Sequence, residues 1–269
     1  MTGTRTVDVD GAPVHVLEAG AGPAVLLLHG SGPGTTGAGA WRATAEALAP
    51  TVRSVAPDQA GFGRTPLPTG SRGGLDVWTG QASPLMAALG HGAYAVVGHS
   101  MGAAVALSLA AAHPDRVSRV VAVGSMGAPC ASLSPDLDAL WAAPPGPAGA
   151  RDMLRRLLLD PALVTDEAVA GRAAAMTAGA EAFARLFPAP RARWVADLTL
   201  PVATLARVQA PVLLVHGAQD RVTPLVESVL PLLEALPDVR LHAFGRCGHV
   251  PQQEHPAAFR RLLADFLAT

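Results

Sequence analysis

A serine with glycines two residues before and after it, at the junction of a predicted strand and a predicted helix, constrains this chain most. Residues 98–102 read GHSMG, after the apolar run 93–97 and before the alanine-rich run 103–112. Such a tight turn pushes the serine out of the sheet, and the glycines let neighbouring backbones pass. The helix that starts there directs backbone N–H groups toward developing negative charge. We therefore predict that Ser100 is a nucleophile; the alternative is a serine that caps an ordinary helix.

An acid and a base follow where the same architecture requires them. The short apolar strand predicted at 212–215 leads to Asp220, which then lies at the carboxyl end of a strand, where open α/β sheets place functional groups. His249 comes after one further helix, predicted at 225–236, and one further strand. In this interpretation His249 accepts the proton of Ser100, while Asp220 fixes the tautomer of the imidazole and stabilises its protonated form.

A glycine-rich loop completes the predicted chemistry. Residues 29–34 read HGSGPG and follow a buried strand, and Gly30, Gly32 and Gly34 allow backbone conformations that are closed to residues with a Cβ. We predict that the backbone N–H groups of Ser31 and Met101 form an oxyanion hole, in which one donor typically contributes about 3 kcal/mol to transition-state stabilisation. The loop is not a Walker phosphate cradle, because that pattern needs a lysine and this chain has none.

The composition restricts the classes of partner. The chain has 269 residues, is 50% hydrophobic and carries a formal net charge of −1 at pH 7. This length and apolar content support one large α/β domain with an insertion, and the absence of a basic stripe argues against nucleic acid as a partner. Cys130 and Cys247 are too few for a disulfide framework, which favours a reducing, cytoplasmic compartment.

Neither a membrane segment nor a metal site is expected. Residues 1–10 lack the apolar core of a signal peptide, and the longest alanine-rich stretch falls short of the ~20 residues of a membrane span. His15, His91, His113, His242 and His255 are scattered and lack the spacing of metal ligands. The predicted chemistry needs no cofactor. The expected partner is a small molecule. The sequence leaves open whether the protein forms a homodimer.

Apolar runs alternate with helical patterns along the chain, as in a doubly wound sheet. Eight strands are predicted, the first two as an antiparallel hairpin and the others mostly parallel, at 4–9, 14–18, 25–29, 52–56, 93–97, 117–123, 212–215 and 240–244. The exception is the segment 128–206, which opens with a proline-rich stretch and continues as short amphipathic helices. We predict a core of residues 1–127 and 207–269, with 128–206 as a helical lid domain inserted after the sixth strand and placed over Ser100.

Several motifs carry a resemblance to a known family. They are LHGSGPG at 28–34, DQAGFGRT at 58–65, GHSMGA at 98–103, LLLDPALVTDEAVAGR at 157–172 and FGRCGHVPQQEHP at 244–256. With these motifs, and with the chain order serine, aspartate, histidine, the sequence resembles the α/β-hydrolase superfamily over its whole length. Within it, the chain resembles the meta-cleavage product hydrolases, which split a carbon–carbon bond in vinylogous 1,5-diketones from aromatic-ring degradation.

The resemblance implies roles for further residues. In that family an arginine of the lid binds the 2-oxo-acid carboxylate of the substrate, and Arg172 matches it; Trp194 resembles a lid tryptophan that faces the pocket. The chain also departs from the family, which usually has asparagine where this sequence has His99 and tryptophan where it has Val250. His99 is either a structural histidine beside the serine turn or a second titrating group near the substrate.

Three functional interpretations follow. The first is a cofactor-free serine hydrolase that cleaves a carbon–carbon bond in a 2-oxo-dienoate, a diketone or a related aromatic compound. The second is a carboxylesterase, thioesterase or lactonase of secondary metabolism that uses the same residues. The third is a non-catalytic ligand-binding protein, which the intact serine, aspartate and histidine set disfavours. The resemblance implies a substrate that is aromatic or carries a carboxylate.

Overall fold

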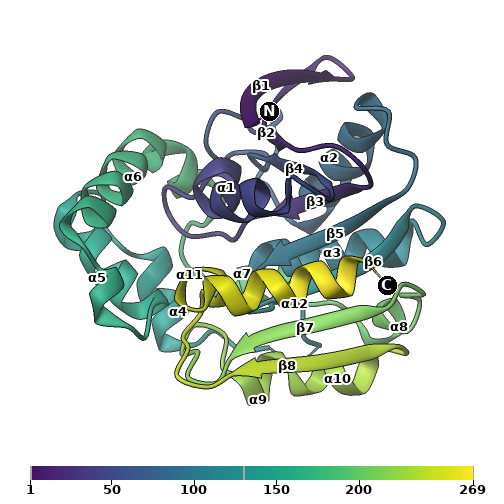
Figure 1. The fold of residues 1–269 in the computed structure, drawn as a ribbon. Helices are drawn as coiled ribbons and strands as arrows, with labels where there is room; N and C mark the ends of the chain where they lie inside the picture. The colour runs from purple at the N-terminus through teal and green to yellow at the C-terminus, as the bar shows by residue number, and fades with distance from the viewer. Residues whose placement is uncertain (1, 130, 269) are drawn as a thin grey trace.

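An eight-stranded sheet organises the computed structural model, which describes residues 2–129 and 131–268 (Figure 1). The strands lie in the order β1-β2-β4-β3-β5-β6-β7-β8; β1 and β4 pair antiparallel with β2, and all other pairs are parallel. Their bounds are β1 Thr2–Val9, β2 Ala12–Ala19, β3 Ala24–Leu28, β4 Arg53–Pro57, β5 Tyr94–His99, β6 Val117–Val123, β7 Val212–Gly217 and β8 Val239–Phe244. The predicted fold, an α/β-hydrolase sheet of eight mostly parallel strands, is confirmed.

Local sequence explains the edge and the centre of this sheet. β1 and β2 are joined by Asp10 and Gly11, whose φ angles of 52° and 84° give the turn that matches the twist of a two-residue hairpin. The central strands β3 and β5 are buried along their whole length because helices cover both faces, and they are accordingly almost entirely apolar.

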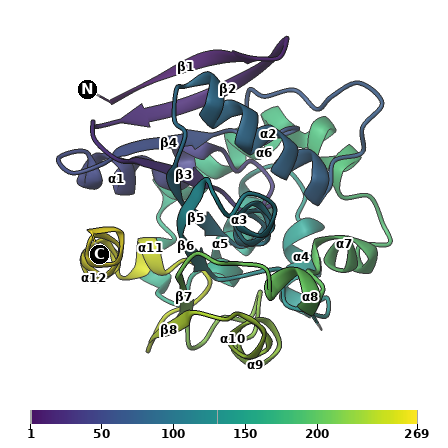
Figure 2. The same ribbon diagram turned by 90° about the vertical axis from the view of Figure 1, so that its right-hand side faces the viewer.

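Helices pack on the two faces of the sheet (Figure 2). One face carries α1 and α12, which contact each other over a core that includes Trp41 and Phe259. The opposite face carries α2, α3 and the pair α9 and α10. The bounds of these helices are α1 Gly37–Leu48, α2 Leu75–Ala88, α3 Met101–Ala112, α9 Leu225–Ser228, α10 Leu230–Ala235 and α12 Pro256–Ala268.

The chain between β6 and β7 forms helices, of which α4, α5 and α6 lie beyond the carboxyl ends of the central strands, whereas α8 packs on α3 and α10 near the start of β7 (Figure 1). They are α4 Pro135–Trp141, α5 Pro147–Leu157, a 3-10 turn at Pro161–Leu163, α6 Asp166–Leu186, α7 Ala192–Leu198 and α8 Val202–Leu205. Their positions agree with a helical insertion after the sixth strand, although α6 is a long helix of 21 residues rather than a short one. The side chain of Thr165 starts it by accepting a hydrogen bond from the backbone N–H of Ala168 at 3.1 Å.

The single helix predicted at 225–236 is wrong, because the structure divides it into α9 and α10. The break lies at Val229, with φ −114° and ψ −44°, two residues before Pro231. Proline has no backbone N–H and its ring collides with the preceding turn, so it is best accommodated in the first turn of a new helix, where Pro231 lies. A further short helix that the sequence did not predict, α11 Pro251–Glu254, follows His249.

Candidate active site

The turn between β5 and α3 holds Ser100 in a strained backbone conformation. Its φ of 56° is in the left-handed region, which a residue with a side chain rarely adopts. A Cβ on Gly98 would lie 2.1 Å from the carbonyl oxygen of Gly102, and a Cβ on Gly102 would lie 2.4 Å from the carbonyl oxygen of Leu28. Glycine is therefore the only residue that fits at either position. The turn presents Ser100 at the carboxyl edge of the sheet, before the first turn of α3.

The loops after β7 and β8 bring an acid and an imidazole together. His249 Nδ1 donates a hydrogen bond of 2.7 Å to Oδ2 of Asp220, and both side chains are buried. Because a carboxylate only accepts, Nδ1 carries the proton and Nε2 is left with a free lone pair. This is the tautomer that accepts a proton from a serine hydroxyl.

Backbone and hydroxyl donors hold the carboxylate of Asp220. Its Oδ1 accepts the N–H groups of Val222 and Thr223 at 2.8 and 3.0 Å, and its Oδ2 accepts the Thr223 hydroxyl at 2.8 Å. Burial alone would raise the pKa of Asp220, but the charge and the hydrogen bond of His249, the charge of His216 and the backbone N–H of Thr223 outweigh it and lower the pKa to about 2. Asp220 is therefore ionised at neutral pH and can stabilise a protonated His249.

Hydrogen bonds also fix the glycine-rich loop after β3. His29 Nδ1 bonds the carbonyl oxygen of Gly30 at 2.8 Å, while its Nε2 accepts the backbone N–H of Gln59 at 3.0 Å. The indole N–H of Trp141, on α4, donates to the Ser31 hydroxyl at 2.9 Å. Within residues 2–129 and 131–268, the backbone N–H groups of Ser31 and Met101 donate to no protein acceptor. Both are thus free to bind an oxyanion.

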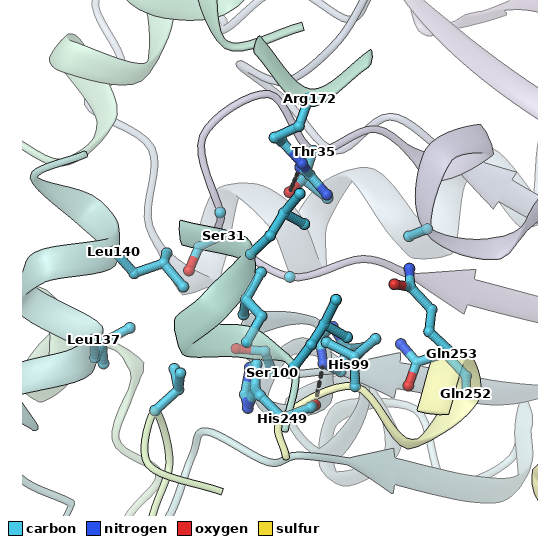
Figure 3. A pocket seen from close by; sticks show the side chains of 18 residues that line it. Ser31, Thr35, His99, Ser100, Leu137, Leu140, Arg172, His249, Gln252 and Gln253 are labelled. Atoms are coloured by element: carbon cyan, nitrogen blue, oxygen red, sulfur yellow. Dashed lines mark hydrogen bonds between the residues drawn. The ribbon is translucent and has the colours of Figure 1, made fainter. Parts of the chain in front are cut away.

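A cavity of about 50 Å³ lies between these loops and the helices of the insertion (Figure 3). Ser100 and His249 line it, and Asp220 lies behind His249. One part of the wall is apolar and comes mostly from the insertion: Leu137, Leu140, Leu154, Leu157, Leu158, Val222 and Val250. The rest is polar or formed by small residues: Gly30, Ser31, Gly32, Thr35, Ala40, His99, Arg172, Gln252 and Gln253. A ligand would thus meet an apolar end and a polar end.

Arg172, on α6, provides a cation at the polar end of the cavity. Its Nη1 donates to the carbonyl oxygen of Pro33 at 3.2 Å and to the Thr35 hydroxyl at 3.1 Å, both neutral acceptors. No carboxylate of the described residues forms an ion pair with it. Burial lowers the pKa of Arg172 to about 10, so the group is still charged at neutral pH. A cation in this state favours an anionic ligand.

His99 lines the same cavity, beside both Ser100 and His249. Its Nε2 lies 2.9 Å from the backbone carbonyl oxygen of His249, and the centroids of the two imidazole rings are 4.7 Å apart. The serine turn and the histidine loop are therefore joined directly by this side chain.

Trp194 is not among the described residues that line the cavity, so the prediction that it faces the pocket is wrong. Its indole N–H donates to the carbonyl oxygen of Pro188 at 2.9 Å, and its ring packs edge-on against Phe187. Phe187 in turn stacks on Trp141 at 4.9 Å between ring centroids. The aromatic side chains of this region thus pack on one another and tie α7 to α4, instead of forming the wall of the cavity.

Glu254, on α11, connects the His249 loop to the end of α5. Its Oε1 accepts the backbone N–H of Gly248 at 2.7 Å, and its Oε2 accepts the N–H groups of Leu159 and Asp160 at 2.8 and 3.0 Å. The backbone N–H of His249 donates to the carbonyl oxygen of Leu157 at 2.8 Å. The position of the imidazole is therefore linked to that of the insertion.

The polar residues of the site that sequence reasoning missed include Thr35, Trp141, Thr223, Gln252, Gln253 and Glu254. Thr223 follows Asp220 by three residues, a spacing at which a hydroxyl often bonds a carboxylate. The others carry no such local signal. No three or more His, Cys, Asp or Glu of the described residues are arranged to hold a metal ion. Cys247 is a buried free thiol, whereas Cys130 lies outside the described residues.

Comparisons with known proteins agree with this geometry. A family model described as the alpha/beta hydrolase fold matches residues 23–256. A 2-hydroxymuconate semialdehyde hydrolase from a Pseudomonas species is 38% identical over 98% of this chain and 93% of its own length. A 2-hydroxy-6-oxo-2,4-heptadienoate hydrolase from Pseudomonas putida is also 38% identical, over 98% of this chain and 96% of its own length.

Solved structures give the same result. A mutant meta-cleavage product hydrolase from Pseudomonas fluorescens, complexed with acetates, superposes with a TM-score of 0.94 at 33% identity, covering 98% of this chain and 97% of its own. A 2-hydroxy-6-oxo-6-phenylhexa-2,4-dienoate hydrolase from Rhodococcus superposes with a TM-score of 0.89 at 32% identity, covering 100% and 99%. In the described part of this chain, no helix has the length and apolar character to cross a membrane.

Proposed function

This chain belongs to the α/β-hydrolase family, and we propose that it is a cofactor-free serine hydrolase that cleaves a carbon–carbon bond in a 2-hydroxy-6-oxo-dienoate. The observation that carries the substrate class is the cation of Arg172, which has no ion-pair partner among the described residues and lines one cavity with Ser100 and His249. A dienoate carries a carboxylate at one end and a ketone near the other. The two groups suit the polar end of the cavity and the serine.

The cavity also favours a short substrate. Leucines of α4 and α5 close its apolar end. Relatives of this chain act, by their names, on a semialdehyde, on a heptadienoate and on a phenyl-substituted hexadienoate. We infer that a hydrogen atom or a methyl group next to the ketone is preferred to a phenyl group.

The proposed reaction assigns a role to each residue that the loops bring together. After the enol substrate has become its keto tautomer, the Ser100 oxygen adds to the ketone carbon as His249 takes the hydroxyl proton. The backbone N–H groups of Ser31 and Met101 stabilise the resulting oxyanion. The scissile carbon–carbon bond then breaks and protonated His249 gives its proton to the leaving carbon. Water, activated by His249, hydrolyses the remaining acyl-serine ester.

Assays of paired substrate panels test this proposal. We expect the purified protein to cleave 2-hydroxymuconate semialdehyde and 2-hydroxy-6-oxohepta-2,4-dienoate faster than the 6-phenyl dienoate, as followed by loss of the absorbance of the conjugated dienoate. Ser100→Ala should remove turnover and leave the unfolding midpoint nearly unchanged, since this side chain makes no hydrogen bond within the described residues that would contribute to stability. Turnover at the wild-type rate by this variant would overturn the nucleophile assignment.

An esterase is the second candidate, because the same residues could hydrolyse an ester bond, which breaks more readily than a carbon–carbon bond. A panel of 4-nitrophenyl esters, assayed beside the dienoates, separates the two functions. Ester hydrolysis without any dienoate cleavage would favour the esterase. A protein that turns over neither panel but binds a dienoate tightly would match the non-catalytic alternative. The lid role of residues 128–206, a homodimer and a cytoplasmic location stay predictions.

A further inference from the structure

The two ring nitrogens of His99 face different surroundings. Nε2 lies 2.9 Å from the backbone carbonyl oxygen of His249. A carbonyl oxygen accepts hydrogen bonds and cannot donate them, so Nε2 carries the proton in this contact. In a neutral imidazole with a proton on Nε2, Nδ1 has a free lone pair and acts only as an acceptor. The backbone of the His249 loop thus fixes the tautomer of His99.

Nδ1 of His99 lies next to the reacting serine. A Cβ built on Gly30 would be 3.2 Å from this nitrogen and 3.0 Å from the Cβ of Ser100. The space that glycine leaves free at position 30 is therefore bordered by both groups. No hydrogen bond within residues 2–129 and 131–268 reaches Nδ1, and His99 lines the cavity beside Ser100 (Figure 3).

His99 stays neutral under the conditions in which a serine hydrolase works. Burial, and after it the charge of the neighbouring His249, lower the pKa of His99 to about 3. His99 therefore does not compete with His249 for the proton of Ser100. It remains an uncharged ring with one donor, used inside the protein, and one acceptor, open to the cavity.

We propose that Nδ1 of His99 accepts a hydrogen bond from a hydroxyl group of the substrate, and that this contact makes His99 a residue that determines specificity. A hydroxyl offers a proton to the lone pair, whereas an ether at the same place would leave two acceptors facing each other. The contact therefore acts when the enol form binds, and it is lost once the substrate becomes its keto tautomer. On the proposed function, on which this identification of the ligand rests, the group is the enol hydroxyl of a 2-hydroxy-dienoate. The contact would select the enol acid over its O-methyl ether and over analogues without the hydroxyl.

Two amide variants separate the acceptor from the tie to His249. The glutamine amide in His99→Gln reaches the position of Nε2, so it keeps the donor to the His249 carbonyl and removes the acceptor at Nδ1. The shorter asparagine amide in His99→Asn reaches the position of Nδ1, so it keeps an acceptor there and removes the tie. A purely structural role predicts that Gln rescues function better than Asn, and the proposed role predicts the opposite for substrate selection.

The measurement is the ratio of the dissociation constant of the methyl ether to that of the hydroxyl substrate, because the ether cannot become the keto tautomer and is not cleaved. Both constants are measured in Ser100→Ala protein, so that neither compound turns over. We expect the protein with His99 to bind 2-hydroxy-6-oxohepta-2,4-dienoate about tenfold more tightly than the 2-methoxy compound, the Asn variant to keep that preference and the Gln variant to reduce it to about twofold. A Gln variant with the same ratio as the His99 protein would overturn the proposal, as would a His99 protein without preference.

A second substrate pair keeps this test independent of the proposed reaction. If wild type does not cleave the hydroxyl dienoate, the proposed function fails, and the ratio of kcat/KM is measured instead for the 4-nitrophenyl esters of 3-hydroxybutyrate and 3-methoxybutyrate. Loss of the hydroxyl preference in the Gln variant, and not in the Asn variant, would still support the acceptor role. Equal ratios in wild type and both variants would overturn it.

Discussion

Two buried imidazole–carboxylate pairs of this protein have nearly the same geometry. His249 Nδ1 lies 2.7 Å from Oδ2 of Asp220, and His15 Nδ1 lies 3.0 Å from Oδ2 of Asp58. All four side chains are buried. Each carboxylate also accepts two backbone N–H groups, those of Val222 and Thr223 at Asp220 and those of Gly37 and Arg64 at Asp58.

The pairs differ in what the other nitrogen of the imidazole faces. The ring of His249 lines the cavity that contains Ser100. Nε2 of His15 is instead enclosed by protein and has no hydrogen-bond partner among the described residues. Asp58 bonds the start of α1 and the loop after β4 to β2, so its pair joins segments of the core. An aspartate–histidine contact is therefore a general means of fixing loops, and it can serve catalysis only where its outer nitrogen reaches a nucleophile.

Replacing each of the two aspartates should distinguish the catalytic pair from the structural pair, and we expect this to give the largest effect. Asp220→Asn keeps the shape but favours the wrong tautomer of His249, so we expect kcat to fall about 10⁴-fold with the protein still folded. Asp58→Asn should leave kcat of the folded protein within about threefold and lower the free energy of unfolding by about 1–3 kcal/mol, because it removes acceptors from buried donors. Steady-state kinetics and urea titration measure both. A comparable loss of kcat in the folded Asp58 variant would contradict the comparison.

Two arginines of the helical insertion can be compared in the same way, because one lines the cavity and the other forms ion pairs within the insertion. The expected effects are smaller. Arg172 lines the cavity without an ion pair, whereas Arg156 bonds Asp152 and Asp136 at 2.8 and 2.7 Å. Arg172→Gln should raise KM for carboxylate substrates by about 10- to 100-fold, the equivalent of a lost charge-assisted contact of about 1.5–3 kcal/mol, and change neutral esters little. Arg156→Gln is the matched control, and it should change neither the KM for carboxylate substrates nor the KM for neutral esters. Equal losses on acids and esters in the Arg172 variant would indicate a packing role.

Acid titration tests the lowered pKa of Asp220 in its pair with His249. Its folded-state pKa of about 2 lies below the ordinary value of 3.8, so the ionised carboxylate stabilises the fold above about pH 4 and this contribution is lost as the pH falls through about 2. The total loss should be about 2 kcal/mol in the free energy of unfolding. Urea unfolding between pH 6 and pH 2.5 measures it, with Asp220→Asn as a reference that lacks this titration. Parallel pH profiles for the two proteins would contradict the assigned pKa.

Much of this architecture could be predicted because its signals are local. Apolar runs identify most of the eight strands, the turn at Asp10 and Gly11 identifies the first hairpin, and the glycines around Ser100 predict its turn because the backbone there leaves no room for a Cβ. The chain order of the motifs places Asp220 and His249 at neighbouring strand ends, where the structure joins them by a hydrogen bond. Such features depend on a few consecutive residues and on the topology of the sheet.

The remaining features depend on contacts between segments that are distant in sequence. Trp194 was predicted to face the pocket, but its direction is set by Phe187 and by the carbonyl oxygen of Pro188. Glu254 bonds the N–H of Leu159, which is 95 residues away along the chain, and no periodicity reports such a partner. The orientation of single side chains in the insertion is therefore decided by packing that a sequence pattern does not contain.

The smallest expected effect concerns Glu254, which links the His249 loop to the insertion. Both oxygens of its carboxylate accept backbone N–H groups. One accepts that of Gly248, and the other accepts those of Leu159 and Asp160. The amide in Glu254→Gln can accept on one side only, and its NH₂ group would face donors on the other. We expect kcat to fall about fivefold on acids and neutral esters alike, because a displaced His249 affects every substrate, together with a loss of about 1 kcal/mol of stability.

A surface glutamate supplies the control for this variant. Glu227 accepts the Ser132 hydroxyl at 2.7 Å at an exposed position, so Glu227→Gln should change neither kcat nor the unfolding midpoint. The two variants are compared by kcat on both substrate classes and by thermal unfolding. A Glu254 variant that loses stability but keeps its full kcat on both classes would show that the link holds the insertion in place without positioning His249. The equal effect on both classes also distinguishes this variant from Arg172→Gln, whose effect is confined to acids.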